Sequence, residues 1–109
     1  MRIADPRTRA DIIASLHQLV AFLHTHPQIP VPTLSRLDLT YFPEGDEEDR
    51  AAEVRRVADL LGTEPRLEGE HYVCQHRLGA AAYRVVAIPD RTRERHRALS
   101  TYTDNIRPD

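Results

Sequence analysis

Apolar residues recur every three or four positions in the first part of the chain, with polar residues between them. The recurring residues are Ile12, Ile13, Leu16, Leu19, Val20 and Leu23. This period predicts an amphipathic helix of about five turns. Asp5 and Pro6 are typical of a helix start, and Pro27 ends the pattern. We therefore expect an N-terminal helix within residues 1–27, followed by an extended segment that contains further prolines.

The next residues predict a strand and then a second helix. Residues 37–42 alternate between apolar and polar, which is the period of a half-buried strand. Asp46 is a suitable cap for a helix with an acidic first turn, and Gly62 is a natural residue just beyond its end. The apolar stripe of this helix comprises Ala51, Val54, Val57, Ala58 and Leu61.

Two further strands, residues 70–77 and 81–88, are predicted around a turn at Gly79. If Gly79 and Ala80 form the loop, one face of the pair is largely apolar and should meet the helices. That face carries Tyr72, Cys74, His76, Tyr83, Val85 and Ala87. The opposite face carries His71, Val73, Gln75, Arg77, Arg84, Val86 and Ile88. A last helix is expected to run from Asp90 to about Tyr102.

The predicted order of elements indicates an α+β fold. Strand–helix–strand connections are right-handed and often leave room for a strand between the two, so we place the third strand in that gap. The expected sheet has three antiparallel strands in the order 2-3-1, with helices on one face. Residues 34–103 would then form a βαββα ferredoxin-like core that lacks the last strand. No repeat or linker divides residues 1–109, so we expect a single domain, with residues 104–109 as a tail.

Four short strings in the middle and C-terminal parts of the chain carry a family resemblance. They are Tyr41-Phe42-Pro43, Val57-Ala58-Asp59-Leu60-Leu61-Gly62, His71-Tyr72-Val73 and Tyr83-Arg84-Val85-Val86-Ala87-Ile88-Pro89. The chain resembles small uncharacterised actinobacterial proteins, over about residues 10–107. These proteins often lie in phage-like or plasmid-like gene neighbourhoods. The resemblance implies an accessory protein of a bacterium or its mobile elements, and it brings no activity, cofactor or catalytic residue with it.

The composition narrows the class of protein. Hydrophobic residues make up 40% of the chain, which is enough for one packed core. No apolar run approaches the ~20 residues that cross a bilayer, and the charged N-terminus is unlike a secretory signal. We therefore expect a cytoplasmic protein without a membrane partner. All fifteen basic residues are arginine, which excludes Schiff-base and P-loop mechanisms that need a lysine.

Residues that could bind metal or act as nucleophiles do not form a recognisable site. The six histidines lack the i, i+3 or i, i+4 spacing of helical ligand pairs, and His71 and His76 fall on opposite strand faces. Cys74, the single cysteine, lies on the apolar face and about 7 Å from His76 along the strand, which is poor for proton transfer. A carboxylate pair for acid–base catalysis stays open. We predict no metal, no cofactor and no enzymatic activity.

The charge distribution leads to two hypotheses of function. Residues 44–70 hold ten acidic residues and four arginines, whereas residues 71–97 hold six arginines and two acidic residues. The leading hypothesis is a homo-oligomeric interaction protein whose interface comprises Val73, Val86, Ile88, Arg77 and Arg84. The alternative is a nucleic-acid-binding protein whose phosphate contacts come from Arg77, Arg84, Arg91, Arg93, Arg95 and Arg97. The net charge of −2 makes the alternative the weaker hypothesis.

Overall fold

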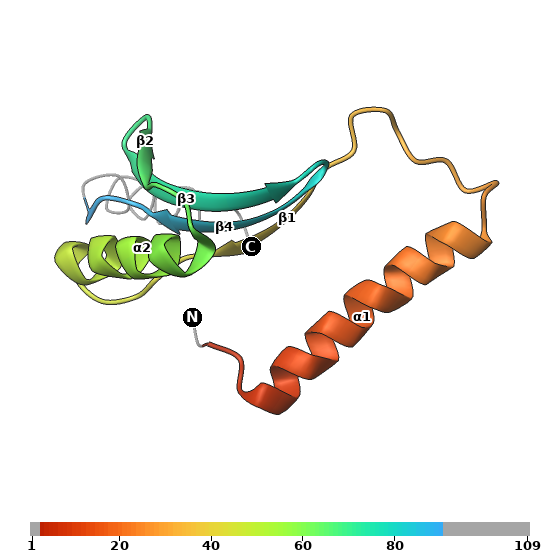
Figure 1. The fold of residues 1–109 in the computed structure, drawn as a ribbon, viewed down its shortest axis with the longest axis horizontal. Helices are drawn as coiled ribbons and strands as arrows, with labels where there is room; N and C mark the ends of the chain where they lie inside the picture. Colours follow the sequence, from red (N-terminus) through yellow and green to blue (C-terminus); the bar gives the residue numbers. More distant parts are fainter. Residues whose placement is uncertain (1–2, 91–109) are drawn as a thin grey trace, which may run out of the picture. The chain divides into compact units, whose positions relative to one another are not determined.

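The computed structural model describes residues 3–90, which form two units divided between Ser35 and Arg36. The first unit consists of α1 (Pro6–Thr25) and the segment that follows it, drawn red to orange in Figure 1. The Asp5 carboxylate caps the helix, because it accepts a hydrogen bond of 2.7 Å from the backbone N–H of Thr8. The helix ends two residues before Pro27, so the predicted N-terminal helix is confirmed.

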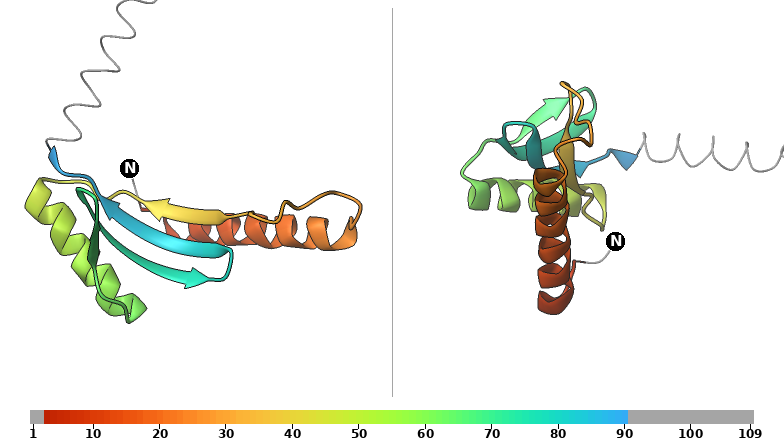
Figure 2. Two further views of the ribbon diagram at one scale, coloured as in Figure 1. Left: turned by 90° about the horizontal axis from the view of Figure 1, so that it is seen from above. Right: turned by 90° about the vertical axis from the view of Figure 1, so that its right-hand side faces the viewer.

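The second unit is a four-stranded sheet with a helix on one face, as Figures 1 and 2 show. Its elements in chain order are β1 (Leu37–Tyr41), α2 (Glu47–Leu61), β2 (Arg66–Glu68), β3 (His71–Leu78) and β4 (Ala81–Ala87). The order across the sheet is β1-β4-β3-β2. β1 runs parallel to β4, whereas the other neighbouring strands are antiparallel. α2 packs against β3 and β4. The α+β class is confirmed.

The predicted three-stranded antiparallel sheet is wrong in detail, although its third strand does lie between the other two. The sequence interpretation missed β2, whose three residues pair with β3. Gly69, at a φ of 63°, adopts the left-handed conformation that glycine tolerates best, and it reverses the chain directly after β2. The helix therefore leads into β2, which lies parallel to β1 at the opposite edge of the sheet. This extra reversal makes β4 parallel to β1, so the sheet is not the expected ferredoxin-like core.

Both ends of α2 are those that the sequence predicts. The Asp46 carboxylate accepts a hydrogen bond of 2.7 Å from the N–H of Asp49, and the Asp49 carboxylate accepts one of 3.3 Å from the N–H of Asp46. This reciprocal capping satisfies two backbone donors at the start of the helix. Gly62 ends the helix in the left-handed conformation.

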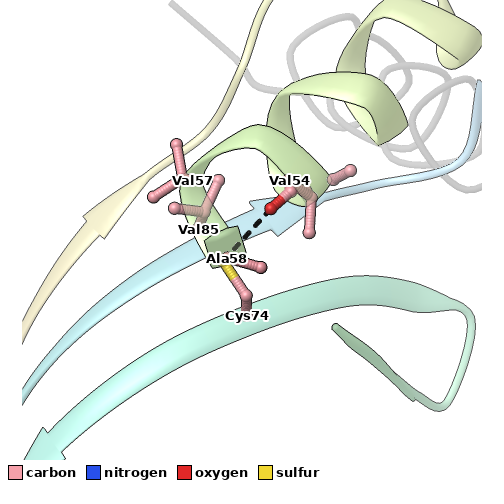
Figure 3. Packing of buried hydrophobic residues seen from close by; sticks show 6 residues of the cluster. Val54, Val57, Ala58, Cys74 and Val85 are labelled. Carbon is pink, nitrogen blue, oxygen red and sulfur yellow. Dashed lines mark hydrogen bonds between the residues drawn. The ribbon is translucent and has the colours of Figure 1, made fainter. Parts of the chain in front are cut away.

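The core lies between α2 and the centre of the sheet. It comprises Val54, Val57, Ala58, Cys74, Val85 and Ala87, most of which Figure 3 labels. Leu78 pairs with Ala81 across the Gly79-Ala80 loop, so the predicted hairpin register is confirmed. The Cys74 thiol donates a hydrogen bond of 3.5 Å to the Val54 carbonyl oxygen. Burial raises the pKa of the Cys74 thiol, and the residue serves as a small apolar core group.

The predicted last helix and tail lie outside the described residues, apart from Asp90 at the start of that helix.

Candidate interaction surfaces

The apolar side of α1 is at least partly exposed along its whole length. We call its six aliphatic residues the α1 stripe: Ile12, Ile13, Leu16, Leu19, Val20 and Leu23. Ile13 is 39% exposed and Val20 is 64% exposed, and no residue of the helix is buried. An amphipathic helix gains most of its stability by burying its apolar side, and a helix of this length is marginal alone. The α1 stripe is therefore a candidate contact surface.

A second set of exposed apolar residues lies partly on the sheet and partly on α2. We call its members the leucine surface: Leu37 (50% exposed), Leu39 (50%), Leu60 (74%) and Leu78 (68%). Leu37 and Leu39 share a strand face with Tyr41, and Leu78 shares one with Cys74, so these leucines lie on the same side of the sheet as α2. Leu37 and Leu39 are exposed because they lie on β1, whereas α2 packs against β3 and β4.

A hydrogen-bonded group joins α2 to β1 and fixes which side of the helix faces that strand. The Tyr41 hydroxyl donates a hydrogen bond of 2.8 Å to Glu53, and Arg56 donates two to the same carboxylate at 2.6 and 2.9 Å. Glu53 and Leu60 are seven residues apart, so Leu60 lies on the same side of α2 as Glu53.

The same group shows that Tyr41 is poorly suited to proton transfer. Desolvation, followed by the hydrogen bond to Glu53, raises the pKa of Tyr41 to about 12. The hydrogen bonds from Arg56 lower the pKa of Glu53, with a smaller contribution from Tyr41. The tyrosine stays protonated and the glutamate stays ionised at neutral pH, which suits a structural contact between β1 and α2.

The sheet face opposite α2 carries two of the predicted site arginines, and both are engaged within the chain. Arg84 donates hydrogen bonds to Gln75 at 3.0 Å and to Glu68 at 2.7 Å, and Glu68 also accepts one from Arg66 at 2.9 Å. Arg77 lies 4.0 Å from the Asp38 carboxylate. The positive charge available to a phosphate is reduced by these neighbours.

The predicted apolar interface residues lie on this face too, but two of them are buried. Val73 is 0% exposed and Val86 is 7% exposed, and they pair across β3 and β4. Ile88, just beyond β4, is partly exposed. Burial of the two valines leaves little of their surface for a partner. The other predicted phosphate-binding residues, Arg91, Arg93, Arg95 and Arg97, lie outside the described residues, so their role stays a prediction.

Arg50 is a structurally important residue that the sequence interpretation overlooked. It is 2% exposed, and it donates hydrogen bonds to Gly45 O at 2.7 Å, Ile88 O at 3.1 Å and Asp90 Oδ1 at 2.6 Å. Asp90 in turn donates its backbone N–H to Glu47 at 2.9 Å. A signal was present, because Arg50 precedes Val54 by four residues and so continues the buried side of the helix.

Within residues 3–90, the structure brings no three His, Cys, Asp or Glu side chains together as a metal ion would require. His26 lies 2.8 Å from the Phe22 carbonyl oxygen, and its ring stacks on that of Phe22 at 4.3 Å. His76 shares a strand face with Cys74, but the thiol is buried and bonded to α2. Neither described helix is long and apolar enough to cross a membrane.

Comparison of the sequence with protein-family models gave no match, and comparisons with curated proteins and with solved structures gave none either.

Proposed function

We propose that this chain is a small, non-enzymatic interaction protein that self-associates through α1. The observation that carries the proposal is the α1 stripe, which presents six aliphatic side chains, none of them buried, on one side of a 20-residue helix. Scattered exposed apolar residues are ordinary in a monomer, but a contiguous stripe is typical of a contact surface. Because Val73 and Val86 are buried, we place the proposed contact on this helix and not on the sheet face.

The nucleic-acid alternative receives less support from the described arginines. Arg84 and Arg66 share Glu68, and Arg77 lies near Asp38, so each has an anion of the chain beside it. A phosphate would have to compete with these neighbours for the same guanidinium groups.

The experiment places charge on the α1 stripe without weakening the helix. In Leu16→Glu/Leu19→Glu, two apolar residues become glutamate, which has a high helix propensity. Each lost leucine burial is worth about 1.5–3 kcal/mol, so the dissociation constant should rise more than a hundredfold. Gln18→Glu, on the polar side of α1, is the matched control.

Light scattering on the purified proteins gives the oligomeric state. We expect the wild type and Gln18→Glu to be dimers or larger, and the double variant to be a monomer. Far-ultraviolet circular dichroism should show that the sheet unit of each variant stays folded. A wild type that is monomeric at 100 μM, roughly a hundred times a micromolar dissociation constant, would refute the proposal. An assembled double variant would also refute it.

A further inference from the structure

The leucine surface and the α1 stripe both carry exposed aliphatic side chains, and every copy of the chain has one of each. The leucine surface comprises Leu37, Leu39 and Leu78 on the sheet and Leu60 on the side of α2 that also carries Glu53. Each of these side chains is at least half exposed. A sheet face that one helix covers only in part is commonly completed by a second helix in the same layer.

The width of the α1 stripe indicates that the stripe packs on a sheet and not on one other helix. At about 100° of rotation per residue, the six residues span an arc of roughly 120°. A two-helix pair uses a narrower seam, here Ile12, Leu16, Leu19 and Leu23, and leaves Ile13 and Val20 at its edge. A helix lying on a sheet beside another helix is contacted from below and from one side, so a wider arc is covered.

The area that a stable interface buries also requires both the α1 stripe and the leucine surface. Ten aliphatic side chains per copy, at on the order of 50–100 Å² of apolar surface each, present about 500–1,000 Å². A stable interface takes about 800 Å² from each partner, and pairing of the two α1 stripes alone would use only six of these ten side chains. A reciprocal arrangement about a two-fold axis uses all ten in each copy and closes the assembly.

We infer that α1 of a second copy lies on the leucine surface, beside α2, with its α1 stripe toward Leu37, Leu39, Leu60 and Leu78. The contact is reciprocal, so the dimer holds two such contacts related by the two-fold axis. This inference rests on the proposed self-association and names the surface that receives α1.

The first test changes the leucine surface and leaves α1 unaltered. Leu60→Glu replaces the most exposed of the four leucines, and this residue lies on a helix, where glutamate is well tolerated. Leu39→Glu places a charge on the edge strand β1. Leu67→Glu is the matched control, because Leu67 is 69% exposed and lies on β2 at the other edge of the sheet. We expect Leu60→Glu and Leu39→Glu to raise the dissociation constant at least tenfold, and Leu67→Glu to leave it unchanged.

If Leu60→Glu stays dimeric while Leu16→Glu/Leu19→Glu is monomeric, α1 binds elsewhere. The inference is then wrong, although the proposed self-association stands. A monomeric wild type would instead refute the proposed function itself. Leu60→Glu decides the matter if Leu39→Glu fails to fold.

The second test uses disulfide trapping, since the native Cys74 is 1% exposed and has a raised thiol pKa. Leu19→Cys and Leu39→Cys proteins are mixed and oxidised, and the wild type serves as the unreactive control. We expect a disulfide between one chain of each kind. Preferential Leu19→Cys homodimers would show pairing of two α1 helices and overturn the inference. In the double variant Leu19→Cys/Leu39→Cys, a disulfide formed only within one chain would also overturn it.

Discussion

Asp90→Asn is expected to destabilise the sheet unit, although the side chain it changes is largely in water. The Asp90 carboxylate is 56% exposed, whereas its partner Arg50 is 2% exposed and lies between α2 and the end of β4. Within residues 3–90, the acidic group bonded to this guanidinium is Asp90, at 2.6 Å, and the other acceptors are the carbonyl oxygens of Gly45 and Ile88. Asparagine keeps the shape of aspartate but removes the charge.

The expected loss in the free energy of unfolding is the cost of leaving the buried Arg50 guanidinium without its anion. Removing one partner of a buried ion pair costs about 3–5 kcal/mol. The exposed side of the Asp90 carboxylate reduces that loss, because water already screens it, and the amide oxygen of asparagine still accepts a hydrogen bond. We therefore expect the free energy of unfolding to fall by roughly 2–3 kcal/mol. At ~4–8 °C per kcal/mol for a domain of this size, the melting temperature should fall by about 10–20 °C.

Urea denaturation followed by circular dichroism measures the effect, and Asp59→Asn, an exposed carboxylate on α2, is the matched control. In an Arg50→Met background this buried cation is absent, so Asp90→Asn should then cost less than about 0.5 kcal/mol. The reasoning is refuted if Asp90→Asn is as mild as Asp59→Asn. It is also refuted if Asp90→Asn costs the same with and without Arg50.

Two further predictions concern the core and its edge. The pKa of Tyr41 is raised to about 12, so the folded state holds the hydroxyl proton more tightly than the unfolded state does. The free energy of unfolding should therefore fall as pH rises from about 10 to 12. Tyr41→Phe should remove that part of the pH dependence. Val86→Asp should unfold the sheet unit, because Val86 is 7% exposed and the substitution would bury a charge. A folded variant with a changed oligomeric state would instead support the interface that the sequence predicts on that face.

Local signals in the sequence were sufficient for the elements that depend on neighbouring residues. Asp46 and Gly62 mark the ends of α2 because capping is decided within one helical turn. The Gly79-Ala80 loop fixes the register of β3 and β4, since a one-residue shift would exchange the two faces of the hairpin.

Features that depend on distant residues were not predictable in the same way. β2 has only three residues, Arg66, Leu67 and Glu68, and its alternation is too short to distinguish it from a loop. Its presence reverses the chain once more and so determines that β1 and β4 are parallel. Arg50 has its partners in Gly45, Ile88 and Asp90, two of which are about forty residues away, so no local pattern shows why a charge is buried there.

Glu68→Gln separates the two hypotheses of function, because the Glu68 carboxylate pairs with two arginines on the sheet face opposite α2. Its carboxylate binds Arg84 at 2.7 Å and Arg66 at 2.9 Å, and the hydrogen bond from Arg84 is the largest cause of its lowered pKa. Stability from this carboxylate is present above its ordinary pKa and is lost as pH falls through the lowered value. Since Glu68 is about one-third exposed, we expect Glu68→Gln to cost only about 1 kcal/mol.

The same substitution releases positive charge on the face that a phosphate would approach. If nucleic acid binds there, Glu68→Gln should bind a random DNA duplex more tightly than the wild type, with a salt dependence steeper by about 0.9 for each additional phosphate that the protein neutralises. Glu64→Gln changes the net charge equally at an exposed site and controls for charge alone. We expect no binding by either variant at near-physiological salt, because Arg84, Arg66 and Arg77 each have a carboxylate of the chain beside them. Duplex binding that Glu68→Gln strengthens and Glu64→Gln does not would establish the nucleic-acid hypothesis instead.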